Sequence, residues 1–369
     1  MNSLVDQGAM RRALALAARA LGTTWPNPGV GCILVRDGRV IGAGATAPWS
    51  SINPQEHAEA GALRHARALG HDPVGATAYV TLAPCTRRSR PDLTACADHL
   101  IAARIARVVV AVADPHQLDS PERFAQAGIP WESGVGEAEA RQIHGGFLTR
   151  MTLGRPRFTG KWAATLDGFL ATVTGHSGWI SSPEALALSR RRRRAFDAIL
   201  VGSGTATQDD PQLLASRRRP GERPGPLRIV VSAGGRLPLE SRLLATLASA
   251  PLLLMHGPGM DPIHRRELAA RGVDLREVAN PHDPRQIAAA LGEMGLNEIL
   301  VEGGSRVHAA FLAAGLYDRL EIYHGARTLG GGLAIAAGPG APRIPDGQGW
   351  RVEVPPRLLG DTVLLRYCR

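Results

Sequence analysis

Three residues in the first hundred positions constrain this chain most, because together they match the ligand set of one metal ion. His57 stands two residues before Glu59, and a proline precedes Cys85, which ten residues separate from Cys96. A catalytic zinc takes three protein ligands and keeps one position open. The sequence therefore predicts a fold that brings His57, Cys85 and Cys96 together, with Glu59 as the acid/base of the site.

This set of residues favours hydrolytic deamination of a nucleobase-like ring. Zinc activates a water near neutral pH, and a neighbouring carboxylate moves protons to the departing ammonia. Nucleobase deaminases usually read H-x-E followed by P-C-x-x-C, so the wider spacing here requires a longer loop before Cys96. The alternative is that both cysteines are ordinary buried thiols and His57 is a surface histidine.

Length and composition predict a soluble protein with two domains. The 369 residues exceed what a single core usually serves, and 44% hydrophobic with 21% charged residues is typical of globular chains. Arg19 interrupts the apolar run between Met10 and Leu21, which therefore predicts an amphipathic first helix and not a signal peptide. No stretch resembles a membrane span. Four cysteines make no disulfide framework, so the cytoplasm is the expected compartment.

A net charge of +10 favours anionic partners, either nucleic acid or phosphorylated small molecules. The densest basic run, Arg190 to Arg194, falls in a predicted helix from Pro183 to Phe196, where most of its side chains are expected to face water. Nucleic-acid readers interleave such charges with aromatic residues, which make up only 4% of this chain. Nucleic-acid binding is therefore not favoured.

Strands and helices alternate in the hydrophobic pattern of the first half, predicted to be a domain over residues 1–150. Asp37-Gly38 separates two apolar runs, Val30 to Val35 and Val40 to Ala43, and predicts a β-hairpin. The other predicted elements are a helix at Glu56–Leu69, strands at Ala78–Leu82 and Arg107–Val112, a helix beginning near Cys96 and a helix at Glu137–Met151.

A second domain, over residues 155–369, is predicted to begin at Gly154-Arg155-Pro156. Its alternation of strands and helices is typical of a twisted α/β sheet, with a surface loop at Arg217–Gly225. Predicted strands are Phe158–Ala164, Ala198–Val201, Leu227–Val231, Pro251–Leu254, Glu298–Val301 and Arg319–Tyr323.

Both halves carry motifs that resemble those of the bifunctional riboflavin-biosynthesis deaminase-reductases, and the likeness covers nearly the whole chain. The first half has Pro26-Asn27-Pro28-Gly29-Val30-Gly31-Cys32, His57-Ala58-Glu59 and Pro84-Cys85. The second half has Leu166-Asp167-Gly168, Gly175-His176-Ser177-Gly178-Trp179-Ile180, Gly202 to Thr205, Asp209-Asp210-Pro211 and Val301-Glu302-Gly303-Gly304.

The resemblance implies an N-terminal cytidine-deaminase-like three-layer αβα domain followed by a dihydrofolate-reductase-like α/β domain. It implies zinc-dependent deamination of a diaminopyrimidinone ribosyl phosphate and reduction of its ribosyl group to ribityl by NADPH. Phosphorylated pyrimidines would be the partners, within a homodimer or larger homo-oligomer.

The resemblance also implies roles for individual residues. Substrate contacts would come from Asn27, Ser177, Arg193, Leu213, Arg217 and Glu302. NADPH contacts would come from Ala163, Trp179, Thr205, Asp209, Gly304, Ser305, Arg306, Val307, His308, Ala309 and Ala310.

The chain departs from the family pattern chiefly in its first half. Thr46 replaces a histidine, and the segment from Cys85 to Cys96 is longer and lacks a histidine and a glycine. In the second half, Phe169 replaces an arginine, Ser232 an aspartate, and an arginine is shifted to Arg217.

Three functions stay open at the level of sequence. The leading one is the bifunctional enzyme. The second is a reductase with a structural zinc domain, and the third is a nucleic-acid deaminase, which would bind with steep salt dependence.

Overall fold

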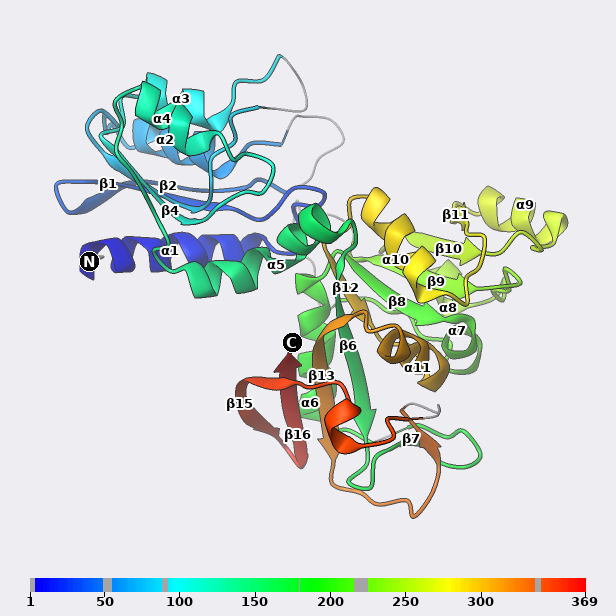
Figure 1. Ribbon diagram of the computed structural model, residues 1–369. Coiled ribbons are helices and arrows are strands. Elements are labelled where there is room, and N and C mark those ends of the chain that lie inside the picture. Colours follow the sequence, from blue (N-terminus) through cyan, green and yellow to red (C-terminus); the bar gives the residue numbers. More distant parts are fainter. Residues whose placement is uncertain (1–3, 49–54, 88–91, 179, 216–224, 336–339) are drawn as a thin grey trace. The chain divides into compact units, whose positions relative to one another are not determined.

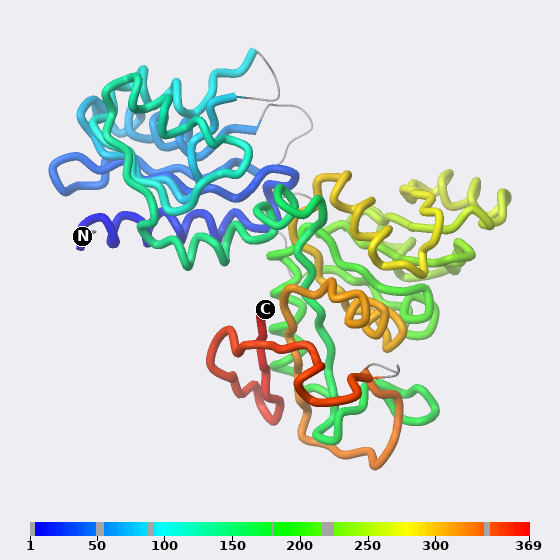
Figure 2. The backbone as a smooth tube through the Cα atoms, viewed as in Figure 1, coloured from blue at the N-terminus to red at the C-terminus, as the bar shows by residue number. Residues whose placement is uncertain are grey.

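The computed structural model describes residues 4–48, 55–87, 92–178, 180–215, 225–335 and 340–369. The chain divides into two compact units, unit 1 from Met1 to Gly154 and unit 2 from Arg155 to Arg369. Figure 1 labels the helices and strands, and Figure 2 traces the same backbone as a tube. In the part described, each helix is too short or too polar to cross a lipid bilayer.

Unit 1 is a five-stranded sheet covered by helices on both faces. Among the described residues the strand order is β2-β1-β3-β4-β5, in which β1 runs antiparallel to its neighbours and β3, β4 and β5 are parallel. Helices α1 and α5 cover one face, and α2, α3 and α4 cover the other (Figure 1). The elements are α1 (Leu4–Ala20), β1 (Gly31–Arg36), β2 (Arg39–Ala45), α2 (Ala58–Ala68), β3 (Thr77–Leu82), α3 (Cys96–Ala102), β4 (Arg107–Val112), α4 (Ser120–Gln126), β5 (Trp131–Ser133) and α5 (Glu137–Leu153).

The core of unit 1 is built largely from alanine and branched aliphatic residues. Parallel strands with helices on both faces are buried on both sides, so β3 and β4 read as continuous apolar runs. The predicted hairpin is confirmed, with Asp37-Gly38 as its turn. The predicted helix at Met10–Leu21 begins earlier, at Leu4, and includes the buried Asp6.

Helix α2 lies unusually close to β2 because two positions of that strand are glycine. A Cβ at Gly44 would lie 2.2 Å from the Ala58 carbonyl oxygen and 2.4 Å from the Ala62 nitrogen. A Cβ at Gly42 would lie 2.5 Å from the Ala62 carbonyl oxygen. Side chains at these positions would push the first turns of α2 away from the sheet.

Unit 2 is built on a nine-stranded sheet in the described part of the chain. Its order is β11-β10-β9-β8-β12-β6-β13-β16-β15, with parallel pairing from β11 through β13 and antiparallel pairing of β16 with both neighbours. Its first elements are β6 (Arg157–Ala164), β7 (Phe169–Ala171), α6 (Pro183–Arg192), the 3₁₀ turn η1 (Arg193–Ala195), β8 (Ala198–Gly202), α7 (Ser203–Gln208), β9 (Leu227–Ser232), α8 (Arg242–Ala245) and β10 (Leu252–His256).

The remaining elements continue the alternation and end in a hairpin. They are α9 (Pro262–Ala270), β11 (Asp274–Glu277), α10 (Pro284–Glu293), β12 (Glu298–Val301), α11 (Ser305–Ala313), β13 (Tyr317–Gly325), β14 (Leu333–Ala334), η2 (Ile344–Asp346), β15 (Arg351–Leu359) and β16 (Thr362–Cys368). A small separate ladder pairs β7 with β14. The outermost strand, β15, contains two successive exposed prolines, Pro355 and Pro356, and its register shifts around them. Proline is tolerated at a sheet edge because no ladder hydrogen bond is lost on the open side.

Three helices of unit 2 begin with a capping side chain followed by proline. Ser182 accepts a hydrogen bond from the Ala185 N–H, Asp261 from Ile263 and His264, and Asp283 from Arg285. The capping side chain accepts a hydrogen bond from a backbone N–H of the first turn, which has no partner within the helix. The proline at the first helical position has no N–H, so one fewer N–H group needs a partner. The cap at Ser182 fixes where α6, which carries the arginine run, begins.

The prediction for the arginine run is wrong in two respects. Helix α6 ends at Arg192, four residues earlier than predicted, and continues as a 3₁₀ turn. Arg192, Arg193 and Arg194 are only partly exposed, because the tighter turn and the adjoining sheet enclose them. The predicted loop at Arg217–Gly225 lies, apart from Gly225, outside the described residues.

Candidate active sites

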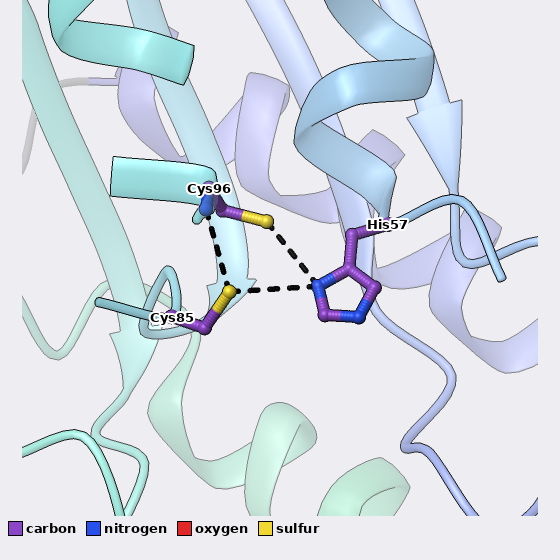
Figure 3. Close-up of side chains that lie close together, drawn as sticks. All are labelled: His57, Cys85 and Cys96. Carbon is purple, nitrogen blue, oxygen red and sulfur yellow. Dashed lines mark hydrogen bonds between the residues drawn. The ribbon is translucent and has the colours of Figure 1, made fainter. Parts of the chain in front are cut away.

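Two helix N-termini and one strand end bring the predicted metal ligands together in unit 1 (Figure 3). His57 is the residue before α2, Cys96 is the first residue of α3, and Cys85 lies in the loop after β3. The Cys85 carbonyl accepts a hydrogen bond from the Ala97 N–H at 3.0 Å, which joins this loop to the start of α3. The glycine contacts of β2 fix the first turn of α2 at the same end of the sheet.

The donor atoms of the three residues face one another. His57 Nδ1 lies 3.2 Å from Cys96 Sγ and 3.7 Å from Cys85 Sγ, and all three donor atoms lie within 4.8 Å of each other. One imidazole and two thiols form the donor set that zinc prefers, with one position of a tetrahedron left over. The residues therefore fit a catalytic zinc.

Ionisation within this cluster is shaped by burial and hydrogen bonding. Hydrogen bonding from Cys96 lowers the pKa of the Cys85 thiol to about 4, while the same contact and burial raise the pKa of Cys96. Glu59 is only 3% exposed, and burial raises the pKa of its carboxyl group. A raised pKa suits a carboxylate that must both take up and release a proton near neutral pH.

A cavity of about 330 Å³ opens beside the cluster. Its wall includes His57, Glu59 and Cys85, the predicted contact Asn27, and the apolar side chains of Phe147 and Met151 from α5. Such a cavity, in which polar and apolar side chains both line the wall, suits a small polar molecule.

Asn27 is oriented by a residue that the sequence interpretation overlooked. Its Nδ2 donates to Gln55 Oε1 at 2.6 Å, while Gln55 Nε2 donates to the carbonyl oxygens of Thr24 at 3.0 Å and Ala47 at 2.5 Å. Thr46, which stands where the family has histidine, is buried and accepts a hydrogen bond from the Val30 N–H at 2.9 Å. Its hydroxyl therefore fixes the backbone at the cavity wall.

Three more cavity residues, Asp114, His116 and Gln117, follow β4 and were not predicted. Asp114 is buried, Oδ1 accepts a hydrogen bond from the His116 N–H at 2.8 Å, and burial raises the pKa of its carboxyl group. Gln117 lies next to them. The signal in the sequence is an Asp-Pro pair directly after a buried strand, since polar residues at such ends collect at one edge of a parallel sheet.

In unit 2, the structure brings together two of the predicted substrate contacts. Arg193 donates from Nε to Glu302 Oε1 and from Nη2 to Glu302 Oε2, both at 2.8 Å. Lys161 Nζ lies 3.9 Å from Glu302 Oε2. Arg193 Nη1 also donates to the Leu214 carbonyl at 2.9 Å, so the backbone beside the predicted contact Leu213 reaches this cluster. Leu213 itself is buried, with a left-handed φ of 51°.

The predicted cofactor segments lie at the ends of two adjacent parallel strands. Gly202 ends β8 before α7, and Gly304 precedes α11 after β12. A Cβ at Gly304 would lie 3.2 Å from Thr205 Oγ1, and a Cβ at Gly202 would lie 2.8 Å from Val307 Cγ2. The two turns are therefore adjacent, as an anion cradle made of backbone N–H groups requires.

The other predicted cofactor residues have diverse environments. His308 is fully buried, and its Nδ1 lies 2.6 Å from the Tyr317 hydroxyl, so its side chain belongs to the core. Ser305, Val307, Ala309, Ala310 and Ala163 are partly exposed, and Arg306 and Asp209 are exposed. Ser177 lies on an exposed turn after β7. Trp179 and Arg217 fall outside the described residues. The binding roles of all these residues stay predictions.

Comparison with known proteins decides the family. Residues 156–348, more than half of the chain, match the model of the RibD C-terminal domain. The chain belongs to the RibD family. Residues 4–112 match the cytidine and deoxycytidylate deaminase zinc-binding region. The chain is thus a bifunctional deaminase and reductase of riboflavin biosynthesis, with a zinc-binding deaminase domain and an NADPH-using reductase domain, and the predicted fold class is confirmed.

Relatives and solved structures are similar to this chain over nearly its full length. The riboflavin biosynthesis protein RibD of Aquifex aeolicus is 37% identical over 334 residues, which cover 90% of each chain. That of Escherichia coli is 34% identical over 92% of this chain and 93% of the relative. A RibD structure from Acinetobacter baumannii has a TM-score of 0.85 at 31% identity, covering 99% of this chain and 98% of that chain.

A further solved structure is named for both reactions. It is the diaminohydroxyphosphoribosylaminopyrimidine deaminase/5-amino-6-(5-phosphoribosylamino)uracil reductase of Thermotoga maritima. It has a TM-score of 0.83 at 29% identity and covers 99% of this chain and 98% of that chain.

Proposed function

We propose that unit 1 deaminates 2,5-diamino-6-(ribosylamino)-4(3H)-pyrimidinone 5′-phosphate, and that unit 2 reduces the ribosyl group of the deaminated product with NADPH. The product is 5-amino-6-(5-phosphoribosylamino)uracil, the reductase substrate named for the Thermotoga maritima relative. The observation that carries the proposal is the convergence of His57 Nδ1 on two cysteine sulfurs, with Glu59 buried beside the same cavity.

In the deamination, His57, Cys85 and Cys96 would hold zinc, which supplies an activated water as nucleophile. The Glu59 carboxylate would accept a proton from the nucleophile and return it to the departing amino group, so that ammonia leaves. Burial of Glu59 favours this exchange, because a carboxylate with a raised pKa is both a base and an acid near neutral pH.

Substrate orientation in unit 1 is assigned to Asn27. Because its amide nitrogen donates to Gln55, the Asn27 carbonyl oxygen is turned to the other side and accepts a hydrogen bond from the ring or ribose. Phe147 and Met151 supply apolar contacts to the ring and help to exclude water. The cavity of about 330 Å³ lies at the lower end of the range for small-molecule sites.

In unit 2, the ion pair of Arg193 and Glu302 is assigned to the sugar phosphate end of the substrate. Ser177, Leu213 and Arg217 are the other proposed contacts. Glycine turns at Gly202 and Gly304 would hold the NADPH phosphates on backbone N–H groups. The cofactor supplies the hydride, so these residues serve to bind and align the ribose carbonyl.

The deaminase half is tested by ammonia release from wild type, Glu59→Gln and Glu56→Gln, with zinc content measured on each. Glu56 stands near Glu59 in the chain, but its carboxylate pairs with the exposed Arg64 and serves as the matched control. Release that is lost only in Glu59→Gln, with zinc retained, supports the proposal. Zinc-loaded wild type that releases no ammonia but still oxidises NADPH with the deaminated substrate would instead make unit 1 a structural zinc domain.

We also propose a homodimer or larger homo-oligomer in the cytoplasm, on the resemblance alone. Light scattering on the full chain gives the mass of the assembly, and a monomeric mass at working concentration would contradict it.

A further inference from the structure

The loop that carries Cys85 is held by a side chain from a different part of unit 1. Gln117 Oε1 accepts hydrogen bonds from the Thr86 N–H at 2.9 Å, the Thr86 hydroxyl at 2.9 Å and the Arg87 N–H at 3.3 Å. Three donors converge on one oxygen, which fixes the orientation of the amide, because its NH₂ group could not accept them.

The segment bearing Gln117 is itself anchored to the same loop. Ser120 is fully buried, and its Oγ lies 2.7 Å from the Pro84 carbonyl and 2.9 Å from the Gln117 carbonyl. The Thr86 hydroxyl also lies 2.9 Å from Asp119 Oδ1, so its single hydrogen is shared between this carboxylate and Gln117. Residues on both sides of Cys85 are therefore tied to the segment between β4 and α4.

On the other side, Cys85 contacts the start of α3, and its sulfur lies 3.7 Å from His57 Nδ1. The Cys85 carbonyl accepts from Ala97, and the Cys85 sulfur accepts from the Cys96 N–H at 3.3 Å. Ten residues separate the two cysteines, a spacer too long to set the position of one sulfur from the other. The contacts from Gln117 replace the constraint that a short spacer would give.

We propose that Gln117 is a positioning residue for the zinc site: its carbonyl oxygen holds the backbone after Cys85, so that this sulfur stays at ligand distance from His57 and Cys96. The proposal rests on zinc binding by unit 1, which is part of the proposed function. Groups that orient metal ligands typically change metal affinity by about 10- to 100-fold when they are lost.

The competing interpretation is that Gln117 only forms the cavity wall or only stabilises the fold. Loss of a wall residue would change KM for the pyrimidine without changing zinc affinity. Loss of general stability would lower the unfolding temperature of the metal-free protein without changing the geometry of the bound metal.

The test uses the full chain and compares Gln117→Ala, Gln117→Glu and the control Gln126→Ala. Gln126 is an exposed glutamine at the end of α4. Zinc affinity is measured by competition with a chromophoric chelator, and site geometry by the visible spectrum of the cobalt(II)-substituted protein. We expect Gln117→Ala to bind zinc about 10- to 100-fold more weakly, with an altered cobalt spectrum. Gln117→Glu keeps an acceptor oxygen and should restore both values, and Gln126→Ala should match wild type.

Each other outcome counts against the proposal. Equal zinc affinity and an unchanged cobalt spectrum in Gln117→Ala would overturn it, as would equal weakening in Gln117→Ala and Gln117→Glu. If Gln117→Ala does not fold, Gln117→Asn decides, because its shorter side chain withdraws the oxygen from the Thr86 and Arg87 N–H groups and should weaken zinc binding; unchanged binding refutes the proposal. Wild type that binds no zinc would overturn the proposed function as well, whereas equal affinities overturn this inference alone.

Discussion

Arg193 and Glu302 form a bidentate ion pair in unit 2, with two 2.8 Å hydrogen bonds between the guanidinium and the carboxylate. Their side chains are only 14% and 9% exposed. Burial opposes ionisation of Glu302, yet the charges of Arg193 and Lys161 outweigh it and lower the pKa of the carboxyl group to about 2. The pair therefore stays ionised throughout the physiological range.

Replacing Arg193 by alanine should destabilise unit 2 by about 3–5 kcal/mol, because Glu302 would stay buried without its partner. Urea unfolding of the full chain, read by hydrogen exchange of peptides from β12, measures this change. Arg191→Ala is the matched control, since Arg191 is exposed and lies two residues earlier, in α6. A loss no larger in Arg193→Ala than in the control would show that the pair adds little to stability.

His308 predicts a pH dependence of stability. Burial and the nearby Lys161 charge lower the pKa of its imidazole to about 3, from an ordinary value of 6.5. The unfolded chain therefore takes up a proton at higher pH than the folded one, and the stability that neutral His308 contributes is lost as pH falls from 6.5 toward 3. Each pH unit in that window costs about 1.4 kcal/mol.

Measurement between pH 6.5 and 5.5 separates His308 from Glu302, because a carboxyl group with an ordinary pKa of 4.5 titrates mostly below this window in the unfolded chain. His308→Asn keeps an acceptor for the Tyr317 hydroxyl but cannot be protonated. Hydrogen exchange of α11, corrected for its intrinsic pH dependence, should show a shallower loss of stability in this variant. Equal slopes in the two proteins would assign the pH dependence to other groups.

Gly44→Ala should disturb the zinc site without touching a ligand. The new Cβ would meet the α2 backbone at 2.2 Å, so the helix start that carries His57 and Glu59 must move. We expect a loss of about 1–3 kcal/mol in stability and weaker zinc binding. Gly8→Ala is the control: no atom lies within 4 Å of its Cβ, and alanine in a helix should be neutral or stabilising. Unchanged zinc affinity in Gly44→Ala would mean that α2 adapts without moving its ligands.

Removing zinc should destabilise unit 1 selectively. Three ligands come from three separate elements, so the metal joins the starts of α2 and α3 to the loop after β3, and its binding energy adds to folding. Chelation should speed hydrogen exchange of α2 and α3 while leaving β9 and NADPH oxidation by unit 2 unchanged. Cys85→Ser should exchange like the chelated wild type. Identical exchange with and without chelator would contradict a structural contribution from the metal.

Local patterns in the sequence predicted much of the fold. The Asp37-Gly38 turn and the apolar runs of β3, β4 and β12 depend on neighbours in the chain, and the predicted strands lie within two residues of the observed bounds at each end. The ligand set was also predictable, because the order of His57, Cys85 and Cys96 is typical of the zinc site of nucleobase deaminases.

Features that depend on distant partners were not predictable. Helix α1 extends back to Leu4, and its buried Asp6 pairs with Arg107, a hundred residues further along the chain. Arg192 and Arg193 are enclosed because they pair with Glu321 in β13 and with Glu302 just after β12, and the arginine run cannot reveal these partners. Gln117 lies three residues after Asp114, but its role could not be predicted, because that role depends on a loop whose path the sequence does not specify.

The sequence did not predict β15, because the strand contains two prolines. The same prolines also limit how another strand can pair with this edge of the sheet. A nine-stranded sheet with an open edge is a template on which a second chain could add a strand. At Pro355 and Pro356 this edge strand has no N–H groups to offer, and its register shifts before and across the two prolines. A strand added at this edge would therefore meet an interrupted ladder, which disfavours edge-to-edge pairing.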